Sequence, residues 1–105
     1  MSIKGSDYRW LLQALDRGDL PLVKATVAQL PAVDLPTALE IALLVLEQEP
    51  HNGERAAVRW LGRLCLERRD VTLPQVREAL VAFASLVEEP EAAEARLRRL
   101  AGLMR

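Results

Sequence analysis

The segment spanning residues 34–50, DLPTALEIALLVLEQEP, most constrains what this chain can fold into. As a helix it is apolar on nearly every side, and four of its side chains are left to face water: Thr37, Glu40, Glu47 and Gln48. A helix of this kind must be covered by its neighbours over most of its surface. Its apolar run is too short for a bilayer, which takes about 20 residues. We therefore expect a buried central helix around which the other segments pack.

The composition is that of a single folded domain covering residues 1–105, because a domain usually has ~100–200 residues. Half of the residues are hydrophobic and 28% are charged, which is typical of globular and not of disordered chains. The net charge of −1 gives no overall attraction to nucleic acid. Cys65 is the only cysteine, which fits a reducing compartment. Since the N-terminal residues lack the apolar run of a signal peptide, we expect a cytoplasmic protein.

Apolar residues recur at helical spacing in six segments, and no segment alternates with the period of a strand. The expected helices cover residues 7–17, 20–30, 35–49, 54–69, 73–87 and 91–104, after a flexible lead-in at 1–5. Ser6, Asp19, Asp34 and Thr72 are the expected N-caps. Residues 50–53, Pro-His-Asn-Gly, predict a turn. Because the linkers are short, the predicted fold is all-α, with about six short helices in antiparallel hairpins that form a small helical-repeat-like bundle.

The apolar stripes of these helices predict the core. In the first helix the inward residues are Tyr8, Leu11, Leu12 and Leu15. In the fourth they are Ala57, Trp60, Leu61, Leu64 and Cys65. In the fifth they are Val76, Ala79, Leu80, Phe83, Leu86 and Val87.

The chain also repeats itself faintly. The triplet Arg-Trp-Leu occurs at residues 9–11 and again at 59–61, each time in the first helix of a pair. A capping residue followed by Leu-Pro occurs at 19–21, 34–36 and 72–74. These repeated motifs are either recurrent helix-start signals or the mark of duplicated helical hairpins in a solenoid.

Several stretches between residues 37 and 90 resemble the tetratricopeptide repeat family. Residues 46–52, LEQEPHN, are similar to the turn between two repeats. The pair Leu61-Gly62 is similar to the small-residue contact in the first helix of a repeat. The spacing of Ala79, Phe83 and Pro90 is similar to that in its second helix. The intervals depart from the 34-residue repeat near residues 69–72. The resemblance implies a non-catalytic scaffold that binds peptides or partner proteins on a concave face.

The sequence shows no catalytic constellation. His51 falls in a predicted turn, and Cys65 lies on an apolar stripe where it is expected to be a small core residue. One histidine and one cysteine are too few to bind zinc. The carboxylate pairs at residues 47/49 and 88/89 are at helix ends, where nothing suggests the cleft that paired carboxylates need. We therefore predict neither an enzyme nor a bound cofactor or metal.

Candidate partner-binding residues are three arginines and two tryptophans. Arg55, Arg59 and Arg63 lie one helical turn apart, in a ridge that is either a docking strip for acidic peptide or phosphate, or a solvated face neutralised by nearby carboxylates. Trp10 and Trp60 are either packing residues or surface anchors for a partner, because Trp is enriched at binding hot spots.

The favoured hypothesis is a small non-catalytic protein–protein interaction module whose partner is a protein, a peptide or a second copy of the chain, and not a membrane. A second copy is included because the third, fifth and sixth helices hold more apolar surface than one small core hides. The alternative is a nucleic-acid-binding regulator in which the fourth and fifth helices form a helix-turn-helix. It would place five arginines near phosphates: Arg55, Arg59, Arg63, Arg68 and Arg69.

Overall fold

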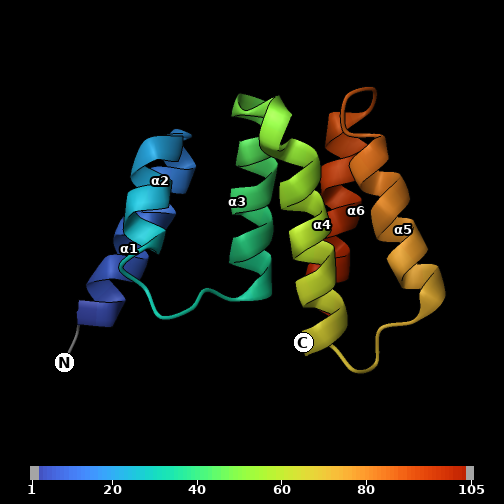
Figure 1. The fold of residues 1–105 in the computed structure, drawn as a ribbon, viewed down its shortest axis with the longest axis horizontal. Helices are drawn as coiled ribbons and strands as arrows, with labels where there is room; N and C mark the ends of the chain where they lie inside the picture. Colours follow the sequence, from blue (N-terminus) through green and yellow to red (C-terminus); the bar gives the residue numbers. More distant parts are fainter. Residues whose placement is uncertain (1–2, 104–105) are drawn as a thin grey trace.

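The computed structural model describes residues 3–103, and in that range it contains six helices and no strand. The helices are α1 (Ile3–Arg17), α2 (Leu20–Val27), α3 (Leu35–Gln48), α4 (Pro50–Glu67), α5 (Leu73–Ala84) and α6 (Pro90–Leu103). Figure 1 shows three consecutive hairpins, with α1 and α2 at one end, α3 and α4 in the middle, and α5 and α6 at the other end. The predicted all-α fold is confirmed. No helix of the described range is both long and apolar enough to cross a membrane.

Local capping explains where three of the helices begin. The carboxylates of Asp19 and Asp34 each accept a hydrogen bond from the backbone N–H three residues later, at 3.2 and 2.9 Å. Thr72 and Gln75 form a reciprocal capping box. A proline follows each cap in the first turn, where its missing N–H costs nothing. The three predicted caps that precede Leu-Pro are therefore confirmed.

The first and last predicted boundaries differ from the structure. α1 begins at Ile3, so Ser6 lies inside the helix and is not its N-cap, and residues 3–5 are helical. α6 begins at Pro90, and its predicted end at residue 104 lies outside the described residues. Residues 1 and 2 of the predicted flexible lead-in also lie outside them.

The predicted turn at residues 50–53 is wrong, because these residues form the first turn of α4. Only Glu49 separates α3 from α4, and Pro50 takes the first helical position, which suits its fixed φ. Gly53 allows this tight connection. A Cβ atom at position 53 would lie 2.6 Å from Cδ2 of Leu46, near the end of α3.

Helix α3 is shared by two hydrophobic cores, which confirms the predicted central helix. Toward α4, α5 and α6 it contributes four residues to the larger core: Leu35, Leu39, Ala42 and Leu43. Toward α1 and α2 it contributes Leu44 to the smaller core. Thr37 was predicted to face water, but it is buried. Its hydroxyl lies 2.6 Å from that of Tyr8 in α1.

The two tryptophans have opposite environments. Trp60 is 3% exposed, its indole Nε1 donates a 2.9 Å hydrogen bond to the carbonyl of Leu35, and its ring meets Phe83 edge to face at 5.9 Å. This side chain therefore joins α4 to the start of α3 and to α5. Trp10 is 58% exposed on α1, so it is not a core residue.

Four residues that were predicted to be buried are exposed: Leu12, Cys65, Leu80 and Val87. Leu12 lies on α1, and Leu80 lies on α5, so both belong to the end hairpins (Figure 1). An end helix has neighbours on one side only, so the apolar residues on its other side stay uncovered. In addition, α5 ends at Ala84, which leaves Val87 in the turn that follows.

Replacing Trp60 by Phe removes a buried hydrogen bond and shrinks a side chain in the larger core. We expect the free energy of unfolding to fall by about 1–3 kcal/mol in a urea titration. Trp10→Phe is the matched control, and it should change the free energy by less than about 0.5 kcal/mol because Trp10 is at the surface. Equal effects of the two substitutions would contradict the role given to Trp60.

Candidate protein-interaction groove

A stripe of small and branched apolar residues on α3 is left partly uncovered between α2 and α4. A hollow of about 220 Å³ lies over this stripe, and its apolar lining is Ala38, Ile41, Ala42, Val45, Ala56 and Trp60. The four α3 residues of the lining are spaced i, i+3, i+4, i+7, so they share one face of the helix. Because α3 is apolar on nearly every side, its neighbours bury most of that surface, Ala42 included, but leave Ala38, Ile41 and Val45 only partly buried.

A second hollow, of about 240 Å³, continues the first toward the α3–α4 connection. The two hollows share Val45, Ala56 and Arg59. Together they form one elongated depression, which we call the α3 groove. At the far end Lys24 of α2 makes an ion pair with both carboxylate oxygens of Glu49, each at 2.9 Å, and so connects the first hairpin to the α3–α4 connection.

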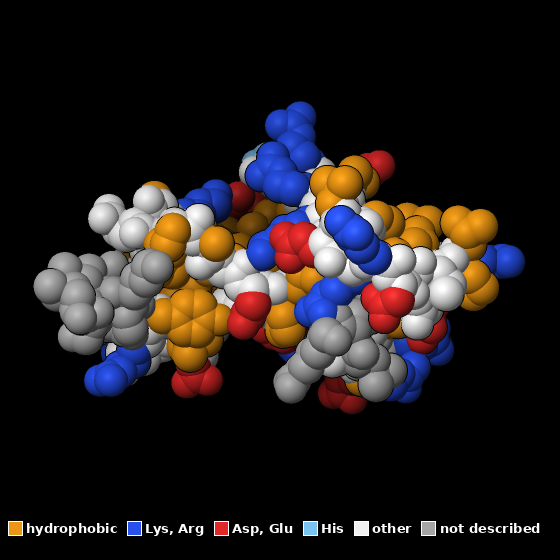
Figure 2. All heavy atoms as spheres, turned by 90° about the horizontal axis from the view of Figure 1, so that it is seen from below, with side chains coloured by type: hydrophobic (Ala, Val, Ile, Leu, Met, Phe, Trp, Pro, Cys, Tyr) orange, Lys and Arg blue, Asp and Glu red, His pale blue; other side chains and the backbone are white. Residues whose placement is uncertain are grey.

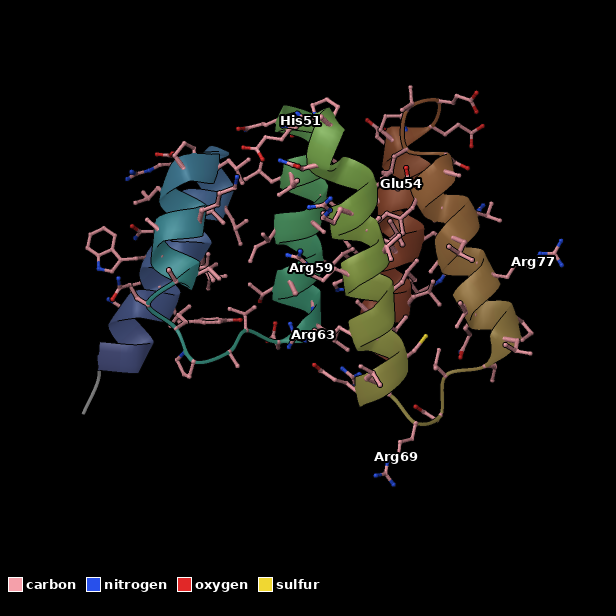
Figure 3. All side chains as sticks on the ribbon, viewed as in Figure 1. His51, Glu54, Arg59, Arg63, Arg69 and Arg77 are labelled. Atoms are coloured by element: carbon pink, nitrogen blue, oxygen red, sulfur yellow. The ribbon has the colours of Figure 1, made fainter. Side chains whose placement is uncertain are left out.

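The arginine ridge of α4 forms one wall of the α3 groove. Arg55, Arg59 and Arg63 contribute to the lining of the two hollows, and Figure 3 shows Arg59 and Arg63 on the stretch of α4 that lies beside α3. In Figure 2 basic side chains gather at the upper edge of the view, with hydrophobic atoms in the recess beside them. The wall is therefore cationic and the floor apolar.

The three arginines of the ridge are not equivalent. Arg63 is held in place, because its guanidinium donates to the carbonyl of Val33 and to the carboxylate of Glu67. Arg55 and Arg59 are exposed, and neither forms an ion pair with any other residue in the described range. Neutralisation of the ridge by intramolecular carboxylates thus applies to Arg63 alone.

A polar cluster fixes the lower end of the groove in the view of Figure 1. The hydroxyl of Tyr8 donates to Asp34 at 3.2 Å, and the backbone N–H of Thr37 donates to the same carboxylate. Burial raises the pKa of Asp34, but the hydrogen bonds from Thr37 and Tyr8 and the charge of Arg63 outweigh it, so the pKa lies below its ordinary value. This cluster therefore attaches α1 and α4 to the start of α3.

The structure does not bring the remaining candidate residues together. Trp60 lines the groove floor as a buried residue, whereas Trp10 is on α1, outside the groove lining. His51 and Cys65 are both exposed on α4, separated by about 21 Å along the helix axis at 1.5 Å per residue. Within residues 3–103 no group of His, Cys, Asp and Glu side chains is placed to bind a metal ion.

The geometry also bears on the helix-turn-helix alternative. In Figure 1 the chain descends along α4 and rises along α5, so these helices are antiparallel neighbours, whereas the two helices of that motif cross at about 90–120°. Arg69 lies in the loop below α4 and points away from Arg59 and Arg63 of that helix (Figure 3). These arginines therefore do not share one surface.

Two of the stretches that resemble tetratricopeptide repeats do not have the expected roles. Residues 50–52 begin a helix and do not form a turn between repeats. Gly62 makes no close contact, because a Cβ atom there would meet nothing within 4 Å. Comparison of the chain with protein families, with characterised proteins and with solved structures finds no match.

The arginine wall was predicted from the sequence, but the groove floor and its far end were not. The missed residues include Lys24, Ala38, Ile41 and Ala56. The signal for the floor was present, because the central helix has more apolar faces than four or five short helices can cover. What the sequence does not contain is which of these faces stays open, since that depends on where α2 sits.

Substituting Asp34 by Asn should flatten the pH dependence of stability at acidic pH. Because the folded-state pKa of Asp34 lies below the unfolded value of about 3.9, its stabilisation is fully present above that value and is lost as the pH falls through the folded-state pKa. Asn keeps the helix cap but does not titrate. Urea titrations between about pH 2 and pH 6 measure the change.

The matched control is Asp70→Asn, which removes one carboxylate from an exposed loop. Some pH dependence should persist in Asp34→Asn, because the hydrogen bond from Lys24 also lowers the pKa of Glu49. If Asp34→Asn and Asp70→Asn followed the same pH profile, the polar cluster would not stabilise the fold.

Proposed function

We propose that this chain is a small non-catalytic protein–protein interaction module of the cytoplasm that binds an acidic amphipathic segment in the α3 groove. The observation that carries the proposal is the open apolar stripe of α3 beside Arg55 and Arg59. Apolar surface that stays open between packed elements is characteristic of binding sites.

The chemistry of the groove selects one kind of ligand. An amphipathic helix can lay its apolar face along a groove through anchors at i, i+3, i+4 and i+7. Carboxylates beside those anchors would meet the guanidinium groups of Arg55 and Arg59, which form charge-assisted and often bidentate hydrogen bonds. A basic segment would be repelled by the same wall.

In this proposal the chain is a helical-hairpin scaffold, as tetratricopeptide-like proteins are, but it has no defined repeat. What supports it is the order of three hairpins along the chain, each beside the next (Figure 1). The α3 groove is lined by α3 and α4, with Lys24 of α2 at one end. Neither a bound cofactor nor a catalytic group is needed for this role.

The test uses a fluorescein-labelled peptide of about 16 residues, long enough for four helical turns, which carries Leu at i, i+3, i+4 and i+7, Glu beside these anchors and Ala elsewhere. Fluorescence anisotropy should show saturable binding to the wild-type chain. The double variant Arg55→Glu/Arg59→Glu should weaken binding at least ~10-fold, or about 1.4 kcal/mol, because it turns attraction into repulsion.

The matched control is Arg9→Glu/Arg17→Glu, which makes the same change in net charge on α1, away from the groove lining. A peptide with the same composition but with Leu spread around the helix should bind much more weakly. Absence of binding by the amphipathic peptide, or equal weakening by both double variants, would refute the proposal.

The nucleic-acid-binding regulator remains the alternative, and the exposure of Arg55, Arg59 and Arg69 favours it. Duplex DNA in the same anisotropy assay distinguishes the two functions. A nucleic-acid-binding protein would lose affinity steeply with salt, with a slope of log K on log salt of about −0.9 for each phosphate neutralised. We expect no saturable binding of duplex DNA at low salt.

A further inference from the structure

The outer face of α5 exposes a line of large apolar side chains. Leu73 is 85% exposed, Leu80 is 52% exposed and Val87 in the following turn is 93% exposed. Leu73 and Leu80 are seven residues apart, which is close to two helical turns, so they share one face of α5, and Val87 lies beyond the end of the helix. The opposite side of α5 is the side that packs, through the fully buried Ala79 and Ala82. Leu80 and Val87 were predicted to be core, and within the described residues nothing covers the line.

A shallow hollow of about 470 Å³ adjoins this line between α5 and α6. Its lining is Leu73, Pro74, Arg77, Glu78, Val81 and Arg96. Figure 3 shows Arg77 pointing away from the body of the molecule, which identifies this face as the free edge of the third hairpin. The hollow can receive an apolar side chain from a partner that packs along α5.

The charges at the two ends of α5 are opposite. The loop before α5 contains Arg68 and Arg69 against the one carboxylate of Asp70, and Arg77 follows one turn into the helix. The carboxylate of Glu78, beside Arg77, is paired with Arg99 of α6 at 3.1 Å. The turn after α5 and the start of α6 hold three exposed carboxylates: Glu88, Glu89 and Glu91. In Figure 1 these two connections lie at opposite ends of the helix.

This charge pattern identifies the occupant. When a second copy packs its own α5 antiparallel against the first, each basic end meets an acidic end and the two apolar lines face one another. A parallel arrangement would place like charges together. An antiparallel pair of identical faces is an isologous twofold contact, the commonest symmetry of protein dimers.

We infer that the chain forms a twofold-symmetric homodimer through the outer faces of two antiparallel α5 helices. The contact is small, because a helix of 12 residues is only about 18 Å long. It therefore falls at the low end of interface sizes and dissociates reversibly. The α3 groove is lined by α3, α4 and Lys24 of α2 and by no residue of α5, so the dimer leaves it open, and this inference stands apart from the proposed function.

Sedimentation equilibrium of the full chain from about 1 μM to about 1 mM, the range in which small interfaces dissociate, is the first measurement. The weight-average mass should rise with concentration from 11.7 kDa toward twice that value. A chain that stays monomeric over the whole range overturns the inference.

Apolar packing is tested with Leu80→Glu, which should abolish the rise in mass. Leu12→Glu is the matched control, because Leu12 is similarly exposed, at 47%, and lies on α1 in the hairpin at the other end of the molecule. Circular dichroism checks that both variants are folded. A dimer that survives Leu80→Glu, or that is lost equally in Leu12→Glu, does not use α5.

The antiparallel charge pairing is tested with two variants that change only exposed side chains: Arg69→Glu/Arg77→Glu and Glu88→Lys/Glu89→Lys. Each variant alone brings like charges together in its own dimer and should stay monomeric. Mixed in equal amounts they should form a heterodimer, because both contacts of the mixed pair again join opposite charges. If either variant dimerises alone as well as the wild type, or if the mixture does not associate, the antiparallel arrangement is wrong.

Discussion

Burial of α3 against two separate sets of neighbours is the constraint on which the rest of the structure depends. Leu39 packs into the core shared with α4, α5 and α6, and Leu44 packs into the core shared with α1 and α2. Removing apolar surface from water is the dominant favourable term in folding, and here one helix supplies it to both sides. The α3 groove results from the same arrangement, because two flanking hairpins cannot cover every face of a helix that is apolar nearly all round.

The elements that local chemistry determines could be predicted from the sequence. The caps at Asp19, Asp34 and Thr72 depend on hydrogen bonds that span three residues, so the sequence alone contains the information. The same local signals failed at Pro50. Proline and asparagine are typical of turns, but proline is equally suited to the first position of a helix, and Gly53 leaves room for this first turn to pack closely against Leu46.

The open surfaces could be predicted only in part, for a different physical reason. Helical periodicity shows which residues share a face, but it does not show whether another helix is available to cover that face. Leu61 and Leu80 have the same pattern in their helices, yet Leu61 is buried because α4 is central and Leu80 is exposed because α5 is at an end. The arginine wall was visible from its spacing, whereas the groove beside it depends on the position of α2.

Arginines at contacts between helices have carboxylate partners, whereas an arginine beside the groove does not. Where helices distant in sequence meet, arginines are paired, as in Arg98 with Glu40 and Arg99 with Glu78. Such exposed pairs add about 0–1 kcal/mol each, so they favour particular contacts between helices more than they stabilise the fold. Arg59 instead lies beside an apolar hollow and has no carboxylate partner among the described residues. If the proposed acidic ligand binds there, an apolar floor that excludes water from the contact would strengthen the pairing of its carboxylate with the guanidinium.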